Sequence, residues 1–238
     1  MTQQTLVSEN KWSWIDISRG ERSLQFASPG TQPGDFLDVT EMLKLEGLTP
    51  PTFADLALLV AEALTFPSDP RFDIFLEVMR ERWLWVDTAA LYLPERGVYI
   101  QDFPIPTKDG RTLREDPFPK GLWMDPEELQ KRLDCGDPNV RFVPFGFKVG
   151  FMDFGALAKN ELFIALCGDA ETANSLAVSA DRLQRDPCLS AFDRVDRPYL
   201  KVAMMGMDLH GEELVVGAKG FDIGPNGNGM CAFGLHPA

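Results

Sequence analysis

Histidine is nearly absent from this sequence, which contains only His210 and His236 among 238 residues. A catalytic serine or cysteine needs a neighbouring base, most often histidine, so such a site would have to use one of these two. Neither histidine lies in a stretch that predicts a buried cleft, and the pattern G-x-S-x-G does not occur. The sequence therefore favours a protein without catalysis of its own.

Cysteine is also scarce and widely spaced. The four cysteines are Cys135, Cys167, Cys188 and Cys231, and no C-x-x-C pattern occurs. This spacing is typical of free thiols in a reducing cytoplasm rather than of a disulfide framework. Cys167 lies just before a predicted helix N-terminus, where the helix dipole could activate a thiol. The alternative, which we favour, is a small buried core residue.

The sequence offers little for a metal ion or a nucleotide. His210, Cys231 and His236 are the only His/Cys group in one region, and their spacing matches no zinc pattern. The glycine-rich stretch GFDIGPNGNGMCAFG, residues 220–234, fits neither a dinucleotide fingerprint, nor a phosphate-binding loop, nor a calcium loop. Its Asn226-Gly227 pair instead predicts a tight hairpin turn between two closing strands. We therefore predict no metal and no cofactor.

Positive charge and long apolar runs are lacking as well. Lys and Arg number 23 against 36 Asp and Glu, which gives a net charge of −13. This charge argues against binding to nucleic acid or to an anionic membrane surface. The most apolar helical stretch, LALLVAEALTF (residues 56–66), is too short to span a bilayer, and the first residues show no signal-peptide pattern. We expect a soluble cytoplasmic protein that binds neither nucleic acid nor membrane.

Apolar residues, by contrast, are plentiful. They make up 45% of the chain, and aromatic residues make up 11%, which is enough to bury a large core. The periodicity predicts helices over 53–66, 70–86, 126–133, 153–166 and 171–183. It predicts strands over 11–17, 23–27, 97–101, 139–145, 199–205, 213–219 and 230–235.

The order of these elements predicts the fold class. Strands and helices do not alternate as they would in a doubly wound parallel sheet. We therefore predict an α+β fold: a mixed or antiparallel sheet that has a C-terminal three-stranded antiparallel segment and several helices packed on it. Residues 1–238 are expected to form a single globular domain, with a possible sub-domain seam near 92–97.

Local signals mark several helix starts. Thr52 and Asp55 have the spacing of a capping box. Asp125-Pro126 places Asp at the N-cap and Pro at the first helical position. Asp153 and Asp169 are predicted to cap two further helices.

The proline-rich segment 102–124 is the most unusual part of the sequence. Asp109-Gly110 predicts a hairpin turn within a protruding ribbon. Four residues of this segment are large and apolar, and they lie among prolines that restrict regular strand pairing: Phe103, Ile105, Phe118 and Trp123. These side chains form either a lid over the core or a docking face for a partner, and the sequence leaves both open.

Acidic residues leave a catalytic alternative open. Asp102, Glu115 and Asp116 lie in or beside the proline-rich segment, and Asp222 lies in the glycine-rich stretch. Two carboxylates at a suitable separation could carry out general acid/base chemistry. The favoured prediction is a binding or assembly component of a multi-protein system, which docks a protein partner through Asp102, Phe103, Ile105, Phe118 and Trp123. The alternatives are a hydrolase or transferase that uses acidic residues, and a small-molecule binder without catalysis.

Overall fold

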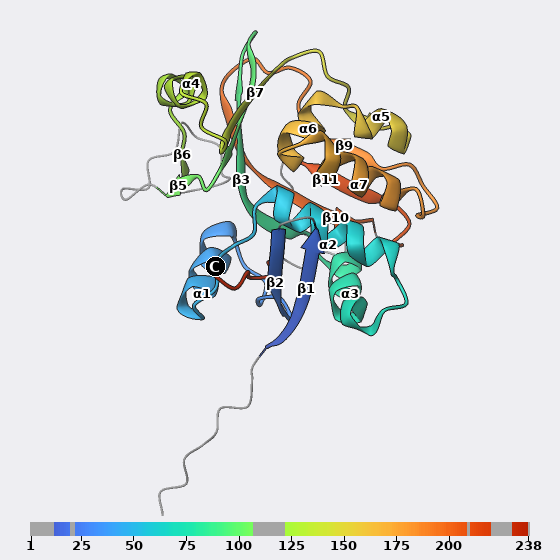
Figure 1. Cartoon of the computed structure of the whole chain (residues 1–238). Coiled ribbons are helices and arrows are strands. Elements are labelled where there is room, and N and C mark those ends of the chain that lie inside the picture. The colour runs from blue at the N-terminus through green and yellow to red at the C-terminus, as the bar shows by residue number, and fades with distance from the viewer. Residues whose placement is uncertain (1–11, 20–21, 107–121, 209, 220–229, 238) are drawn as a thin grey trace, which may run out of the picture.

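The computed structural model describes residues 12–19, 22–106, 122–208, 210–219 and 230–237 (Figure 1). The helices in these ranges are α1 (Phe36–Leu45), α2 (Phe53–Thr65), the short 3₁₀ helix η1 (Pro70–Phe72), α3 (Asp73–Glu81), α4 (Pro126–Asp134), α5 (Phe154–Ala158), α6 (Glu161–Cys167) and α7 (Ala170–Ala180). The strands are β1 (Ser13–Arg19), β2 (Arg22–Ser28), β3 (Leu84–Leu93), β4 (Gly97–Asp102), β5 (Ile105–Pro106), β6 (Leu122–Trp123), β7 (Val140–Pro144), β8 (Gly150–Phe151), β9 (Cys188–Ser190), β10 (Tyr199–Met207) and β11 (Leu214–Gly217). No helix in the described ranges is long and apolar enough to cross a membrane.

Seven of these strands form one sheet, in the order β7-β4-β3-β10-β11-β9-β8. Every neighbouring pair in it is antiparallel except β11 and β9, which are parallel. The predicted pairing of the first two strands is also present, because β1 and β2 form an antiparallel hairpin. Together with the helices packed on the sheet, this arrangement confirms the predicted α+β class.

Helices cover both faces of the sheet, and each face has its own core. α2, α3, α5, α6 and α7 pack on one face together with the β1–β2 hairpin, and α1 and α4 pack on the other (Figure 1). Successive side chains of a strand point to opposite faces. Strand β3 therefore serves both cores: Leu84 and Val86 join the first, and Trp85 and Ala89 join the second.

Short-range capping signals start the helices where they were predicted. The Thr52 hydroxyl accepts from the backbone N–H of Asp55 at 3.2 Å, and the Asp55 carboxylate accepts from the backbone N–H of Thr52 at 3.0 Å. This is the predicted capping box of α2. Asp125 caps α4, with Pro126 at its first position, and Asp169 caps α7, both as predicted.

The predicted helix over 153–166 is in fact two helices. Asp153 caps α5 as expected, but α5 ends at Ala158. The Asn160 side chain then accepts from the backbone N–H groups of Leu162 and Phe163, and the chain restarts there as α6. A polar side chain that satisfies unpaired N–H groups is a start signal as strong as any preceding periodicity.

The prediction of a helix over 70–86 is wrong beyond Glu81. α3 ends there, and the sequence LWVDTAALYL forms the ten-residue strand β3. Because β3 lies between β4 and β10 and is covered on both faces, its sequence is almost continuously apolar. Such a run lacks the alternation of a half-exposed strand, so helical spacing at Trp83 and Val86 was mistaken for a continued helix.

The third C-terminal strand was assigned the wrong partner. β10 and β11 pair antiparallel as predicted, but the other neighbour of β11 is β9. The segment 230–235 instead forms isolated bridges with Phe26, Gly34, Thr49 and Leu84. It therefore ties the N-terminal third of the chain to β3. The predicted Asn226-Gly227 turn lies outside the described residues.

The segment near 92–97, where a sub-domain seam was considered, is a tight turn. β3 and β4 pair antiparallel across it, from Leu93↔Gly97 to Thr88↔Asp102. Glu95 in this turn has a positive φ of 59°. The two strands it joins lie side by side inside the seven-stranded sheet.

Gly217 at the end of β11 provides a test of this sheet order. Its φ is 144°, and a Cβ there would lie 2.1 Å from the backbone oxygen of Ser190 on β9. We expect Gly217→Ala to destabilise the protein by about 3 kcal/mol or more, because backbone strain adds to a clash with backbone. Gly47→Ala is the control. Gly47 also has a positive φ, 73°, but nothing lies within 4 Å of its Cβ position, so about 1 kcal/mol is expected. Equal urea midpoints for the two variants would contradict the β11–β9 pairing.

Candidate functional site

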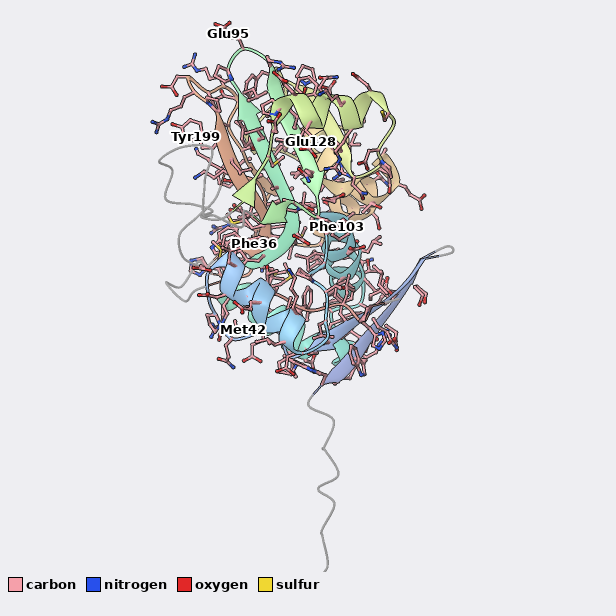
Figure 2. All side chains as sticks on the ribbon, turned by 90° about the vertical axis from the view of Figure 1, so that its left-hand side faces the viewer. Phe36, Met42, Glu95, Phe103, Glu128 and Tyr199 are labelled. Carbon is pink, nitrogen blue, oxygen red and sulfur yellow. The ribbon has the colours of Figure 1, made fainter. Side chains whose placement is uncertain are left out.

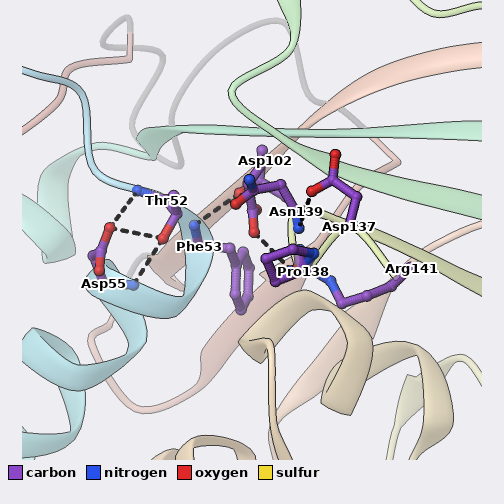
Figure 3. Close-up of polar contacts among 9 residues, drawn as sticks. Thr52, Phe53, Asp55, Asp102, Asp137, Pro138, Asn139 and Arg141 are labelled. Atoms are coloured by element: carbon purple, nitrogen blue, oxygen red, sulfur yellow. Dashed lines mark hydrogen bonds and ion pairs between the residues drawn. The ribbon is translucent and has the colours of Figure 1, made fainter. Parts of the chain in front are cut away.

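Asp102, at the end of β4, lies in a buried polar cluster (Figure 3). Its Oδ1 accepts a hydrogen bond from the Thr88 hydroxyl at 2.6 Å. The Thr88 oxygen in turn accepts from the backbone N–H of Phe53, the first residue of α2, at 2.9 Å. The carboxylate is thus connected to one of the unpaired N–H groups at a helix start, which would otherwise be buried without a partner.

Arg141 on β7 pairs with the other oxygen of the same carboxylate. Its Nη1 lies 2.7 Å from Asp102 Oδ2 and also donates to the Pro138 carbonyl at 3.1 Å. The Asp102 side chain is buried, with 8% exposed, and the Arg141 side chain is largely buried, with 17% exposed, so the ion pair is mostly shielded from water. The Nε and Nη2 atoms of Arg141 are buried without a hydrogen-bond partner in the described chain. Arg141 therefore depends on Asp102 for its charge compensation.

The turn before β7 holds this end of the sheet in place. The backbone N–H of Asp102 donates to the Asn139 carbonyl at 2.9 Å. Asp137 accepts from the Asn139 N–H at 2.9 Å and from Arg132 Nε at 2.8 Å. These hydrogen bonds, first the one from the Asn139 backbone, hold the pKa of Asp137 below its usual value. The turn is thereby kept in one conformation beside Asp102.

Phe103 follows Asp102 directly and has two unfavourable properties at once. Its side chain is 53% exposed, and its φ is +55°. The other non-glycine residue with positive φ in the described chain is Glu95, which lies in the tight β3–β4 turn. Phe103 has no such hairpin around it. Its conformation is held by its N–H, which donates to the Asp87 carbonyl at 2.8 Å.

Phe103 lies near the middle of the molecule, on its surface. Figure 2 shows it between α4, marked by Glu128, and α1, marked by Phe36 and Met42. The exposed ring is therefore framed by two helices that cover the same face of the sheet. An aromatic side chain held rigidly in such a position is suited to contact a partner.

Asp87 on β3 is the second carboxyl of this region. Its pKa is raised to about 7, chiefly by partial burial; the charge of Lys44 lowers the pKa in part, and the charge of Asp102 contributes to the rise. No side-chain hydrogen bond or ion pair of Asp87 is formed in the described chain. A carboxylate taken out of water without a partner is unfavourable, which is why its neutral form gains.

The structure brings together two of the five predicted site residues. Asp102 and Phe103 are adjacent, with Asp102 buried and Phe103 exposed. The backbones of Ile105 and Trp123 pair in the short β5–β6 ribbon. Phe118, Asp222 and the acidic pair at 115 and 116 lie outside the described residues.

Sequence reasoning missed Asp87, Thr88 and Arg141. The signal for the first two was the polar pair Asp-Thr inside the apolar run LWVDTAALYL, which is unusual in a buried strand. Arg141 gave no local signal, because its partner lies 39 positions earlier in the chain. Asp102 uses both carboxylate oxygens for Thr88 and Arg141, which ties it to the scaffold.

Two of the four thiols, those of Cys167 and Cys231, are buried. Cys167 is fully buried, and burial raises its pKa well above the usual value, the opposite of an activated thiol. Burial likewise raises the pKa of Cys231, to about 12. His236 packs edge-on against Trp14, with ring centres 5.5 Å apart. No group of three or more His, Cys, Asp or Glu side chains suited to a metal ion occurs among the described residues.

A hollow of about 250 Å³ lies between α1 and the loop after β2. Apolar groups provide most of its lining, among them Trp12, Pro29, Met42 and Leu43. Its volume is just below the ~300–1,000 Å³ typical of small-molecule sites. It shares no lining residue with the cluster around Asp102 and Phe103.

The sequence matches no protein-family model and no curated protein. The fold, however, is similar to that of a solved structure described as "Accommodation of massive sequence variation in Nanoarchaeota by the C-type lectin fold". The match has a TM-score of 0.54 and covers 95% of this chain and 98% of that chain. This chain has a C-type lectin-like fold. At 13% sequence identity the similarity concerns the fold alone.

Loss of the Asp102 carboxylate should be strongly destabilising. We expect Asp102→Ala to lower the free energy of unfolding by about 3–5 kcal/mol, because Arg141 would remain buried without its counter-charge. The double variant Asp102→Ala/Arg141→Met should be less destabilised than the single variant. Arg71→Met, which breaks the exposed Arg71–Asp69 pair, should cost less than about 1 kcal/mol. Urea unfolding measures the stability of all three variants. A double variant less stable than Asp102→Ala would contradict the ion-pair interpretation.

Asp87 should make stability depend on pH. Its carboxyl ionises near pH 7 in the folded protein but near pH 4 in the unfolded chain. Between these values the folded state binds more protons, so stability falls as pH rises. We expect Asp87→Asn to remove this part of the decline and to be more stable than the wild type at about pH 8, by on the order of 2 kcal/mol. Urea midpoints measured across this range test the difference, and parallel pH curves for the two proteins would refute it.

Proposed function

We propose that this protein is a non-catalytic binding protein that recognises a protein partner through a surface centred on Phe103. The observation that supports this proposal is the exposed and strained Phe103, which directly follows Asp102 and its ion pair with Arg141. Strained backbone that the surrounding structure enforces occurs preferentially at functional sites.

Phe103 carries two energetic costs that another residue would avoid. A positive φ costs an ordinary residue about 1–2 kcal/mol, and glycine would remove that cost. Half of the aromatic ring is left in water, where a polar residue would be better accommodated. Both costs make sense if the ring is buried by a partner, since aromatic anchors at interface centres contribute the most binding energy.

The rest of the site favours binding over catalysis. Both oxygens of Asp102 are occupied by scaffold contacts, and the thiols of Cys167 and Cys231 are buried. The nanoarchaeal protein of similar fold is described as accommodating massive sequence variation. A fold that tolerates variation on a stable frame is suited to recognition, and we extend that suitability to this chain. The four cysteines, all free thiols, support an assembly component that works in the cytoplasm.

The test is capture of a partner by purified bait proteins from a lysate of the native host. Phe103→Gly removes the ring and also relieves the strained φ, so its stability should stay within about 1 kcal/mol of the wild type. We expect at least one protein to be enriched by the wild type and reduced about ten-fold or more by Phe103→Gly, as quantified by mass spectrometry.

Phe151→Ser is the matched control for this experiment. Phe151 is also an exposed phenylalanine, 70% accessible, but it lies on β8 at the far edge of the sheet. This variant should capture the same partner as the wild type. If Phe103→Gly retains every protein that the wild type retains, the docking surface is not at Phe103. A Phe103→Gly protein destabilised by more than about 3 kcal/mol would show that the ring serves the core instead.

A further inference from the structure

Asp87 on β3 lies opposite Phe103, the residue that directly follows β4. The pairing of β3 with β4 ends at Thr88↔Asp102, and the next hydrogen bond runs from the Phe103 N–H to the Asp87 carbonyl. Residues bonded in this way have Cα atoms about 5 Å apart. A group that contacts the exposed ring of Phe103 therefore comes within reach of the Asp87 side chain.

The two carboxylates of this region differ in how their charge is compensated. Asp102 accepts from the Thr88 hydroxyl and is paired with Arg141. Asp87 has neither a side-chain hydrogen bond nor an ion pair in the described chain. Lys44 on α1 acts on the Asp87 carboxyl only through the longer-range attraction between their charges. Asp87 therefore has a partly buried carboxyl that forms no ion pair with a cationic side chain among the described residues.

We propose that the partner presents a lysine or arginine side chain to Asp87, beside the ring of Phe103. This inference rests on the proposed function and specifies the chemistry of the same surface. A cation placed there compensates the unpaired carboxylate and also lies against an aromatic ring, which attracts cations by its quadrupole. Arginine fits better than lysine, because its planar group both stacks on a ring and donates two parallel hydrogen bonds to a carboxylate.

The net charge of the whole chain also favours a cationic partner. A net charge of −13 attracts cationic groups over a distance and repels acidic ones. Long-range attraction raises the rate of encounter, whereas the contact at Asp87 supplies the specificity.

Two capped peptides that differ in one group test the proposal. One is acetyl-Gly-Arg-Gly-amide, and the other carries citrulline, which is neutral and nearly isosteric, in place of arginine. Each is titrated into the isotopically labelled protein while the amide signals of Phe103 and Thr88 are followed by NMR. We expect the arginine peptide to shift both signals in a saturable manner and to bind about ten-fold more tightly than the citrulline peptide. Equal binding of the two peptides, or no shift with the arginine peptide, would overturn the proposal.

Asp87→Asn provides the matched protein variant, because it removes the charge and keeps the shape. The arginine peptide should bind this variant no better than the citrulline peptide binds the wild type. Binding to the wild type should also weaken as the pH falls from about 8 to about 6, because protonation of Asp87 removes its charge. The groups that act on Asp87 are Asp102 on β4 and Lys44 on α1, and both remain in the variant. Arginine binding that is unchanged in Asp87→Asn would overturn the proposal.

Asp87→Asn used as a bait separates this inference from the proposed function. A partner that is lost with Phe103→Gly but fully retained with Asp87→Asn would refute the cationic contact and leave the docking surface standing. A partner that both variants retain would remove the docking surface itself. Loss with both variants supports both proposals.

Discussion

One buried carboxylate, that of Asp102, determines how this end of the molecule is built. Through Thr88 it connects β3 and β4 to the first residue of α2, and through Arg141 it connects them to β7. Four elements thus meet at a single charged group. Since the pair is largely buried, losing either partner leaves an uncompensated charge, which is strongly destabilising.

The neighbouring Asp87 shows the opposite use of the same chemical group. Asp102 is satisfied inside the protein, whereas the side chain of Asp87, one residue before Thr88, forms no hydrogen bond or ion pair with the residues that the structure describes. Side chains alternate along β3, so Asp87 and Thr88 lie on opposite faces of the sheet. Thr88 and its partner Asp102 face α2, whereas Asp87 faces α1 with Trp85 and Ala89. The side that is fully paired serves the scaffold, and the side that is not paired is the one on which recognition is proposed. The scaffold contacts and the proposed recognition surface therefore lie on opposite faces of the same sheet.

Local signals in the sequence predicted the parts of the fold that depend on local physics. The caps of α2, α4 and α7 act within four residues, so Thr52, Asp125 and Asp169 could be read directly. The strand β3 was misread because burial on both faces removes the alternation that marks a strand. The pairing of 230–235 was misassigned because its partners, from Phe26 to Leu84, lie far earlier in the chain.

The residues of the site also differ in whether local sequence could predict them. Phe103 was predicted from an aromatic residue among prolines, which is a local pattern. Its supporting residues were not, because the Asp102–Arg141 pair joins two strands that contact only after the sheet has formed. The strained φ of Phe103 is a property of the folded backbone and has no signature in composition. Sequence could therefore name the exposed residue but not the reason for its position.

The bridges of segment 230–235 also bear on how the chain folds. Leu235 hydrogen-bonds with Thr49 in both directions, and Gly234 accepts from the N–H of Ala27, so early parts of the chain are completed by very late ones. Contacts of such long separation slow folding, because the connecting chain must first be restrained. Until residues 230–235 have packed, the β1–β2 hairpin lacks these bridges and the surface that they cover stays open. A partly folded chain of this kind is prone to aggregate through that surface.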